Sequence, residues 1–223
     1  MKSSSGKNSA KFQPDDNQLR TYVSRAGLKL AGVAGKFGLD FAGKVVLDIG
    51  SSTGGFTDFA LRSGAAKVIA VDVGTNQLHV SLRGNPKVEL YEKTDIRDVA
   101  AVSAPITVAV ARATVKPKII VQKPAVILID VSFISIREIL LHVAQYFATP
   151  DTEIVAMVKP QFEAGAKLKN AGVIKNDTVR RQILKDFEFW AKKHFVIRQK
   201  VDSPVAGAHG NRERFYLLMK AKR

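Results

Sequence analysis

Apolar residues along the chain recur with two alternating spacings, which predicts helices and strands in turn. From Leu28 to Phe37 they recur at helical spacing, and Gly38 follows as a stop signal. Residues 45–50 then form a short apolar run that ends in glycine, as expected for a strand buried on both faces. The same change from helix to strand repeats along most of the chain.

The complete pattern predicts strands at residues 45–50, 68–73, 88–91, 125–130, 153–159, 195–201 and 214–220. It predicts helices at residues 28–37, 55–62, 77–82, 134–147 and 178–194. This order indicates an α/β fold of the Rossmann-like class: a doubly wound, mostly parallel seven-stranded sheet with an antiparallel edge strand. We expect one domain, residues 24–223, after a flexible basic arm, residues 1–23. Residues 100–123 show no clean period and are expected to be an insertion.

The net charge of the chain indicates a class of binding partner. Thirty-five Lys and Arg against twenty Asp and Glu give a formal net charge of +15. Such a balance favours a polyanion such as RNA, although a merely basic protein remains the alternative. The sequence has no cysteine, which excludes disulfides and thiolate metal sites and fits a reducing cytoplasm. The four histidines lack metal-ligand spacing, and we expect neither a metal site nor a membrane span.

A glycine-rich turn after the first predicted strand has the sequence Asp48-Ile49-Gly50-Ser51-Ser52-Thr53-Gly54-Gly55-Phe56. Glycines let the backbone approach a ligand, and the helix N-terminus that follows suits an anionic group. NAD enzymes, methyltransferases and purely structural turns all contain such a loop. The pattern alone therefore predicts a ligand pocket but does not choose the ligand.

Three carboxylates narrow the choice. Asp48 would repel a pyrophosphate but could receive an amino group, and Asp72 ends the second strand where an acid can bind ribose hydroxyls. Asp95, after the third strand, could contact an adenine edge or cap a helix. S-adenosyl-L-methionine has both an amino group and a free ribose. These residues therefore favour a methyltransferase over an oxidoreductase.

Asp130 and Lys159 each end a predicted parallel strand, at the edge of the sheet where α/β proteins bind ligands. They could face each other over the reacting group, or they could form only a structural ion pair. Phe56 follows the glycine-rich turn, and Phe133 and Phe162 follow Asp130 and Lys159. Each of the three rings could stack on a base or simply pack. Spacing alone leaves these alternatives open.

Six stretches in register show a resemblance to the TlyA-like group of FtsJ-type rRNA methyltransferases. They are Ser24-Arg25-Ala26-Gly27-Leu28-Lys29-Leu30, Asp48 to Thr57, Ala70 to Gly74, Asp130 to Ser135, Val158 to Glu163, and Gly210 to Glu213. The resemblance runs in order from Ser24 to the C-terminus. It implies ribose 2′-O-methylation of ribosomal RNA, free or in ribosomal subunits, with S-adenosyl-L-methionine as the methyl donor.

The resemblance also implies which residues react. Such enzymes carry a Lys-Asp-Lys-Glu set, which falls here on Lys29, Asp130, Lys159 and Glu213. Lys159, with a pKa lowered by desolvation or a nearby cation, would take the hydroxyl proton. Asp130 and Glu213 would fix the lysines and the hydroxyl, and Lys29 would orient the ribose or its phosphate. The implied cofactor contacts are Asp48, Gly50, Ser51, Ser52, Thr53, Gly54, Gly55, Phe56, Asp72, Val73, Asp95 and Asp130.

Two features depart from the family pattern. The 23 residues before Ser24 are too few for the small RNA-binding domain with which such enzymes usually begin. RNA docking is then expected to rest on the arm, the insertion and the basic C-terminal segment. Arg214 stands where an apolar residue is expected. The rival functions are a non-catalytic RNA-binding or ribosome-assembly factor and a small-molecule methyltransferase, whereas the lytic role suggested by the haemolysin label of some relatives finds no support in the sequence.

Overall fold

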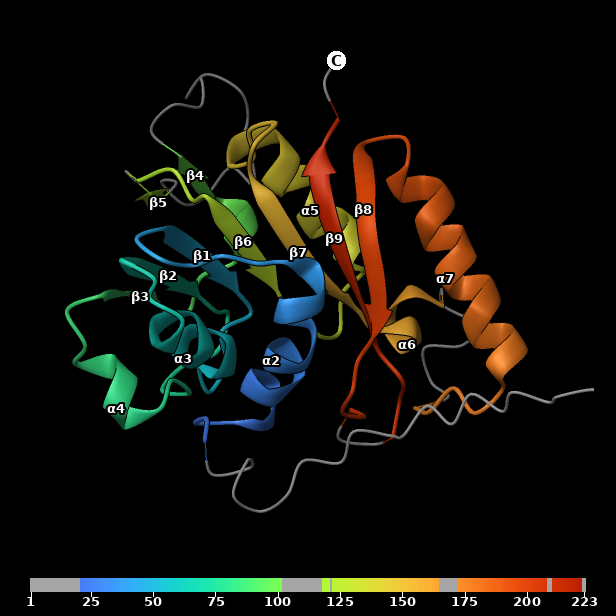
Figure 1. Ribbon diagram of the computed structural model, residues 1–223, viewed down its shortest axis with the longest axis horizontal. Coiled ribbons are helices and arrows are strands. Elements are labelled where there is room, and N and C mark those ends of the chain that lie inside the picture. The colour runs from blue at the N-terminus through green and yellow to red at the C-terminus, as the bar shows by residue number, and fades with distance from the viewer. Residues whose placement is uncertain (1–20, 102–117, 121, 165–171, 208–209, 222–223) are drawn as a thin grey trace, which may run out of the picture.

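The computed structural model describes residues 21–101, 118–120, 122–164, 172–207 and 210–221. Most of the predicted basic arm, and most of the predicted insertion at 100–123, lie outside these residues. Figure 1 shows the described part as a central sheet covered by helices on both faces. The predicted α/β fold is therefore confirmed.

The main sheet contains the seven predicted strands, in the order β3-β2-β1-β6-β7-β9-β8 (Figure 1). Their bounds are β1 Val45–Ile49, β2 Lys67–Val71, β3 Val88–Tyr91, β6 Val126–Ile129, β7 Glu153–Val158, β8 Phe195–Asp202 and β9 Arg214–Lys220. The antiparallel pairing lies at the predicted edge, where β9 runs antiparallel to both neighbours and β8 is outermost. Strands β1 and β6 are parallel neighbours at the centre of the sheet. From β1 the chain adds β2 and β3 toward one edge, and from β6 it adds the later strands toward the other, so the sheet is doubly wound.

The helices are α2 Arg25–Phe37, α3 Gly55–Arg62, α4 Val80–Arg83, α5 Ile136–Tyr146, α6 Pro160–Glu163 and α7 Asp177–Ala191, with a 3₁₀ turn, η1, at Ile96–Asp98. Most differ from the predicted bounds only at their ends. Helix α5 begins two residues later than predicted because the Ser135 side chain caps it. The short helix α6 was not predicted, since four residues carry no readable period.

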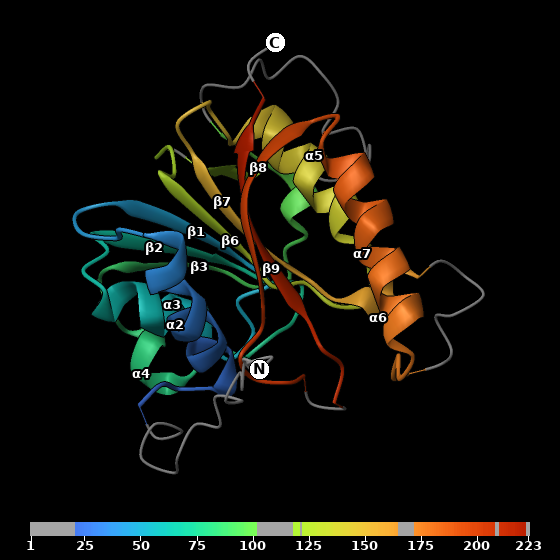
Figure 2. The same cartoon turned by 45° about the vertical axis from the view of Figure 1, so that its right-hand side comes forward.

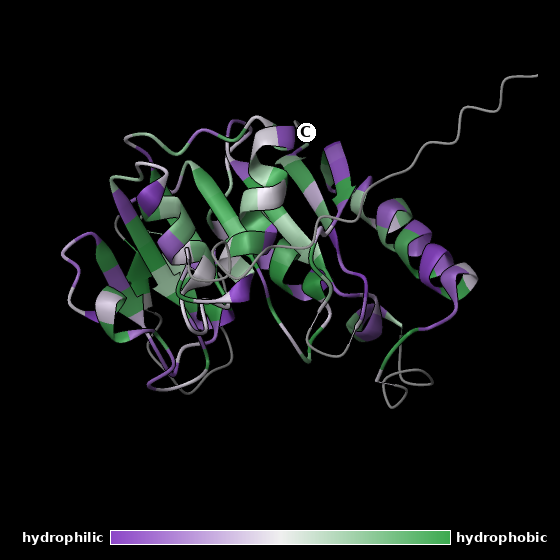
Figure 3. Ribbon diagram, turned by 60° about the horizontal axis from the view of Figure 1, so that its bottom comes forward, coloured by the Kyte–Doolittle hydropathy of each residue, from purple (hydrophilic) through white to green (hydrophobic). Residues whose placement is uncertain are grey.

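Two apolar layers hold the helices to the sheet. One joins α5 and α7, through residues such as Leu140 and Phe187, to one face of the sheet. The other joins α2 and α3, through Leu30 and Phe59, to the opposite face. Figure 2 shows the two helix pairs on opposite sides, and Figure 3 shows apolar strands between helices with polar outer surfaces. Burial on both faces explains the continuous apolar runs of the central strands.

The predicted insertion begins and ends in a small second sheet. Strand β4, Val99–Ala101, pairs in parallel with β5, Lys118–Ile120. The two ends of the segment are thus brought together on the domain. Within the described ranges, no helix has the length and apolar character needed to cross a membrane.

Candidate active site

Two adjoining pockets lie at the carboxyl ends of the parallel strands, which is the lower edge of the sheet in Figure 1. The first has a volume of about 410 Å³ and is lined by the ends of β1 and β2 and by the loops after β3 and β6. The second, of about 400 Å³, lies between the start of α2, the end of β7 and the loop before β9. The pockets share the lining residues Ser52, Asp130, Ser132 and Phe133. A group bound in one can therefore meet a group bound in the other.

Gly50 brings the glycine-rich turn against the loop that follows β6. Its φ of 80° lies in the region that favours glycine. A β-carbon at this position would stand 2.5 Å from the carbonyl oxygen of Asp130. The close approach of two backbones thus fixes the floor of the first pocket beside the predicted catalytic carboxylate.

We expect Gly50→Ala to lower the free energy of unfolding by about 1–3 kcal/mol, because both the positive φ and the Asp130 backbone oppose a side chain. Urea unfolding measures this loss. Gly35→Ala is the matched control, since Gly35 lies in α2 with open space around its β-carbon position. Equal stabilities of the two variants would contradict the close approach at Gly50.

Asp48 lies under the same turn and is fully buried at the end of β1. Thr57 Oγ1 donates a hydrogen bond of 2.6 Å to its Oδ2 atom. Oδ1 has no partner among the described residues, and the same holds for the buried Ser51 Oγ. Burial raises the pKa of Asp48 to about 7, against the Thr57 hydrogen bond and with a further rise from Asp130 and Asp72. The turn therefore holds unused polar atoms and a carboxylate that would gain from a cationic partner.

The raised pKa predicts a pH-dependent stability. In the unfolded chain Asp48 ionises near 3.8, so between pH 4 and 7 the folded protein holds the extra proton. Stability therefore falls as pH rises through this window, by up to about 4 kcal/mol at pH 8. Between pH 5 and pH 8 we expect urea unfolding to show about 3 kcal/mol of this fall in the wild type and a smaller fall in Asp48→Asn. Equal falls in both proteins would contradict it.

Asp72 and Asp95 line the first pocket from its other side. Asp72 accepts backbone hydrogen bonds from Ser52 and Gly74, at 2.8 and 2.6 Å, and so ties the glycine-rich turn to the loop after β2. Asp95 caps η1 by accepting from the Arg97 backbone and forms an ion pair of 2.6 Å with the Arg97 guanidinium. The helix-cap prediction for Asp95 is thus confirmed, while its contact with adenine stays a prediction.

The rest of the turn packs against its surroundings, which the sequence analysis gave as one of two alternatives for Phe56 but did not predict for the glycines. A β-carbon on Gly54 would meet Leu82 and Leu78, and one on Gly55 would meet Ser24 and the backbone of α2. The buried Phe56 ring lies 6.2 Å from that of Phe215 in the core. None of these three residues, nor Thr53, lines either of the two pockets described above. Val73, by contrast, is exposed in the first pocket.

Asp130 and Lys159 come together where the pockets meet. Lys159 Nζ lies 2.6 Å from Asp130 Oδ1 and donates a hydrogen bond of 2.7 Å to Ser132 Oγ. Their strands, β6 and β7, are parallel neighbours, so both side chains reach the same edge. The ion pair is thus present and lies in the candidate site, while its role beside the reacting group stays a prediction.

Lys29 and Glu213 form a second ion pair in the second pocket, with 2.6 Å between Nζ and Oε2. Only 11% of the lysine side chain and 4% of the glutamate side chain are exposed. Strand β9 pairs with β7 so that Arg214 lies opposite Val158, which brings Glu213 to the end of the strand that carries Lys159. All four residues of the predicted catalytic set therefore lie in one pocket.

Several residues of the site were missed by the sequence analysis. Ser132 binds Lys159, and Asn211 lies buried in the second pocket, where its side chain bonds the backbone of Ile174 and Gly172. Glu163 accepts hydrogen bonds from Ser135 Oγ and the Ile136 backbone, which ties α6 to α5. Ser132 and Glu163 each lie in a quoted motif, two residues after Asp130 and four residues after Lys159, and that position was the available signal.

Comparison with known proteins agrees with this geometry. A family model described as FtsJ-like methyltransferase matches residues 22–221. The chain belongs to the FtsJ-like methyltransferase family. It is 39% identical over 202 residues to the 23S rRNA (cytidine-2′-O)-methyltransferase TlyA of Campylobacter jejuni, a match that covers 89% of this chain and 71% of that protein. The resemblance seen in the sequence motifs is thus confirmed.

Two further similar proteins support the assignment. The 16S/23S rRNA (cytidine-2′-O)-methyltransferase TlyA of Mycobacterium tuberculosis is 35% identical over 203 residues, which cover 89% of this chain and 69% of that protein. A solved structure of a proposed hemolysin from Lactococcus lactis has 36% identity and a TM-score of 0.76 over 90% of this chain and 89% of its own. The fold and the pockets therefore belong to a methyltransferase domain. In the described part of the chain, no cluster of three or more His, Cys, Asp or Glu could hold a metal ion.

Proposed function

We propose that this FtsJ-like methyltransferase uses S-adenosyl-L-methionine to methylate a ribose 2′-hydroxyl of ribosomal RNA. The observation that carries the proposal is the junction of two pockets at the Asp130–Lys159 pair. One pocket suits the methyl donor and the other suits a nucleotide. The similarity to the TlyA enzymes supports ribosomal RNA as the acceptor.

The first pocket offers groups that fit S-adenosyl-L-methionine. Asp48 and Ser51 lie buried behind the residues that line this pocket, and each has an oxygen without a partner among the described residues. These oxygens suit the amino acid part, which carries an ammonium and a carboxylate. Asp72 suits the ribose hydroxyls, and Asp95 suits the adenine edge. When bound, this cofactor supplies a methyl group carried on a sulfonium.

The second pocket suits a nucleotide of a polyanion. Arg25 and Lys29 line it and provide positive charge, in a chain with a net charge of +15. Phe133 is 89% exposed at the border of both pockets, and its ring centroid lies 5.1 Å from that of Phe162. Its φ of 65° is costly for a bulky residue, so the backbone holds this ring outward at some expense. An outward aromatic ring can stack on an unpaired base, as RNA-binding proteins commonly do.

We assign to Lys159 the role of accepting the proton of the 2′-hydroxyl. In its amine form it accepts the proton, and Asp130 and Ser132 then hold the resulting ammonium by the contacts seen here. Lys29, held by Glu213, lines the same pocket and orients the ribose or its neighbouring phosphate. Much of the rate would come from alignment of the hydroxyl with the methyl group, since such transfers depend strongly on geometry.

If a base stacks on Phe133, removal of the ring should lower activity on RNA more than it lowers affinity for the cofactor. We expect Phe133→Ala to lower kcat/KM for RNA by about 10- to 100-fold, since stacking contributes about 1–3 kcal/mol per base. The affinity for S-adenosyl-L-methionine, measured by calorimetry, should fall by a smaller factor, because Phe133 lines the first pocket only where that pocket borders the second. Phe189→Ala is the matched control, because Phe189 is also exposed but lies on α7, away from both pockets. Equal losses in the two variants would contradict stacking at Phe133.

The proposed function is tested by methyl transfer from labelled S-adenosyl-L-methionine to ribosomal RNA, free and in ribosomal subunits. The labelled RNA is then hydrolysed in alkali, which cleaves next to free 2′-hydroxyls only. We expect the label to remain in an alkali-resistant dinucleotide. Label released with single nucleotides would indicate a methylated base. An absence of label in every RNA would favour the rival reading, a binding factor that keeps the fold.

A further inference from the structure

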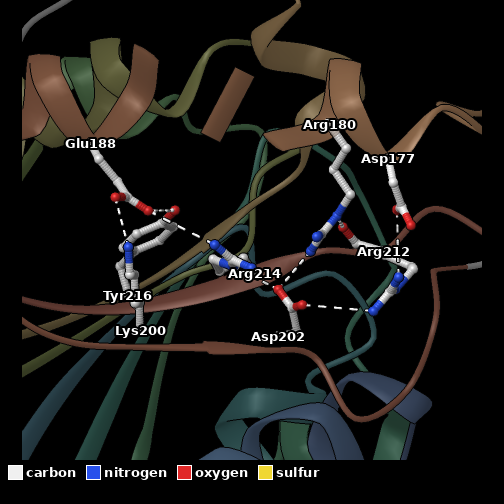
Figure 4. A network of polar contacts seen from close by, with 8 residues as sticks. All are labelled: Asp177, Arg180, Glu188, Lys200, Asp202, Arg212, Arg214 and Tyr216. Carbon is white, nitrogen blue, oxygen red and sulfur yellow. Dashed lines mark hydrogen bonds and ion pairs between the residues drawn. The ribbon is translucent and has the colours of Figure 1, made fainter. Parts of the chain in front are cut away.

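A network of charged side chains lies between α7, β8 and β9, next to Glu213 in the sequence but outside both pockets (Figure 4). At its centre is Asp202, the last residue of β8. Its Oδ1 atom accepts hydrogen bonds of 2.6 Å from both Arg180 Nη2 and Arg214 Nε. Arg212 approaches the other oxygen at 3.8 Å. Although burial acts to raise the pKa of Asp202, hydrogen bonds from Arg214 and Arg180 hold it below its ordinary value.

The network fixes the backbone on both sides of Glu213. Before it, Arg180 Nε donates a hydrogen bond of 2.8 Å to the carbonyl oxygen of Arg212. After it, the Arg214 side chain is held by Asp202. The carbonyl of Glu213 itself accepts a hydrogen bond of 2.9 Å from the backbone of Ser203, the residue that follows Asp202. Helix α7 and strand β8 thus hold the three residues 212–214 in one arrangement.

Arg180 is the arginine of this network whose burial costs the most free energy. It is 5% exposed, and its guanidinium divides its hydrogen bonds between a side chain and a backbone carbonyl. Attachment of α7 to the sheet does not need such a group, because the apolar residues Leu184, Phe187 and Ala191 already pack there. A buried ion pair can often be replaced as a whole by apolar residues without loss of stability, so the pair of Arg180 with Asp202 is not needed merely to hold α7 in place. The contacts of Arg180 with Asp202 and with the carbonyl of Arg212 therefore indicate a role in the geometry around Glu213 rather than in stability.

We propose that Arg180, together with Asp202, is a positioning residue that sets Glu213 and, through Glu213, the Lys29 ammonium in the second pocket. The expected effect on kcat rests on the proposed function, whereas the expected effect on the position of Lys29 does not. The positioning role also explains Arg214, which stands where the family pattern leads us to expect an apolar residue. The arginine there is the partner of Asp202.

The first test measures how fast Lys29 is acetylated in the free protein, and it needs no activity assay. Trace acetylation followed by mass spectrometry gives the labelling rate of each lysine. In the wild type Lys29 should react slowly, because it is buried and paired. We expect Arg180→Met to raise its rate toward that of Glu213→Gln. Arg181→Met, a change of the neighbouring exposed arginine on α7, should leave the rate unchanged.

The second test is a double-mutant cycle in kcat for methyl transfer to RNA. We expect Arg180→Met alone to lower kcat by about 10- to 100-fold, since a displaced positioning group can cost this much. In a Glu213→Gln background the same change should cost less than about twofold, because both changes act on one contact. Affinity for S-adenosyl-L-methionine and urea unfolding are measured on every variant, so that a general loss of folding is recognised.

Two results would overturn the inference. One is an unchanged labelling rate of Lys29 in Arg180→Met. The other is an equal factor lost in kcat with and without Glu213→Gln, which would mean that Arg180 acts only through overall stability. If the wild type transfers no methyl group to RNA, the proposed function fails, and the labelling rates alone then decide whether Arg180 positions Lys29.

Discussion

Replacement of Lys159 by alanine should reduce methyl transfer to RNA by about a thousandfold, within the range of 10²–10⁴ that a general base supplies. The reason is the position of Lys159 where the two pockets meet, 2.6 Å from Asp130 and 2.7 Å from Ser132. Cofactor affinity should change by less than about threefold, because Lys159 does not line the first pocket. Single-turnover kinetics and calorimetry measure the two quantities.

Two companion variants sharpen this result. Lys159→Arg keeps the positive charge beside Asp130 but cannot lose its proton at neutral pH, so it should be nearly as inactive as Lys159→Ala. Lys36→Ala, a change of an exposed lysine on α2, should behave like the wild type. Normal turnover by Lys159→Arg would mean that the charge, and not proton transfer, is what the reaction needs. Normal turnover by Lys159→Ala would contradict any role in the chemistry.

Replacement of Glu213 by alanine should be the most destabilising change at the site, by about 3–5 kcal/mol, because it leaves a buried ammonium without its partner. The distance of 2.6 Å and the low exposure of both side chains are the basis of this figure. Urea unfolding measures it. Methyl transfer should also be lost, because Lys29 no longer has a fixed position in the second pocket.

The double variant Lys29→Met/Glu213→Leu separates stability from function. A buried ion pair can often be exchanged for apolar residues at little cost, so this variant should recover most of the stability lost in Glu213→Ala. It should nevertheless stay inactive, because the orienting ammonium is gone. A double variant that is both stable and active would show that the pair only holds α2 to the sheet.

Most of the fold could be predicted from the sequence because the central strands are buried on both faces. Val126–Ile129, for example, is buried throughout and reads as an uninterrupted apolar run. Asp130 and Lys159 follow such runs, and parallel strands that are neighbours end at the same edge. The meeting of these two side chains was therefore open to prediction from the chain alone.

The remaining features depend on contacts that no local pattern records. Lys29 and Glu213 are separated by 184 positions, and only the family resemblance placed them in one set. Phe56 follows the glycines of the turn, yet its ring belongs to the core, because a helix start turns successive side chains to different faces. The role of Arg214 depends on Asp202 across the strand pair, so the sequence shows it only as an exception.

The most direct test of the proposed function uses two RNA substrates that differ in one atom. The methylated nucleotide is first mapped, and a fragment containing it is then synthesised with either a 2′-hydroxyl or a 2′-hydrogen at that position. We predict methyl transfer to the first fragment and none to the second, with similar binding of both. Equal transfer to the 2′-deoxy fragment would show that a base atom accepts the methyl group, and would contradict the proposed ribose 2′-O-methyltransferase activity.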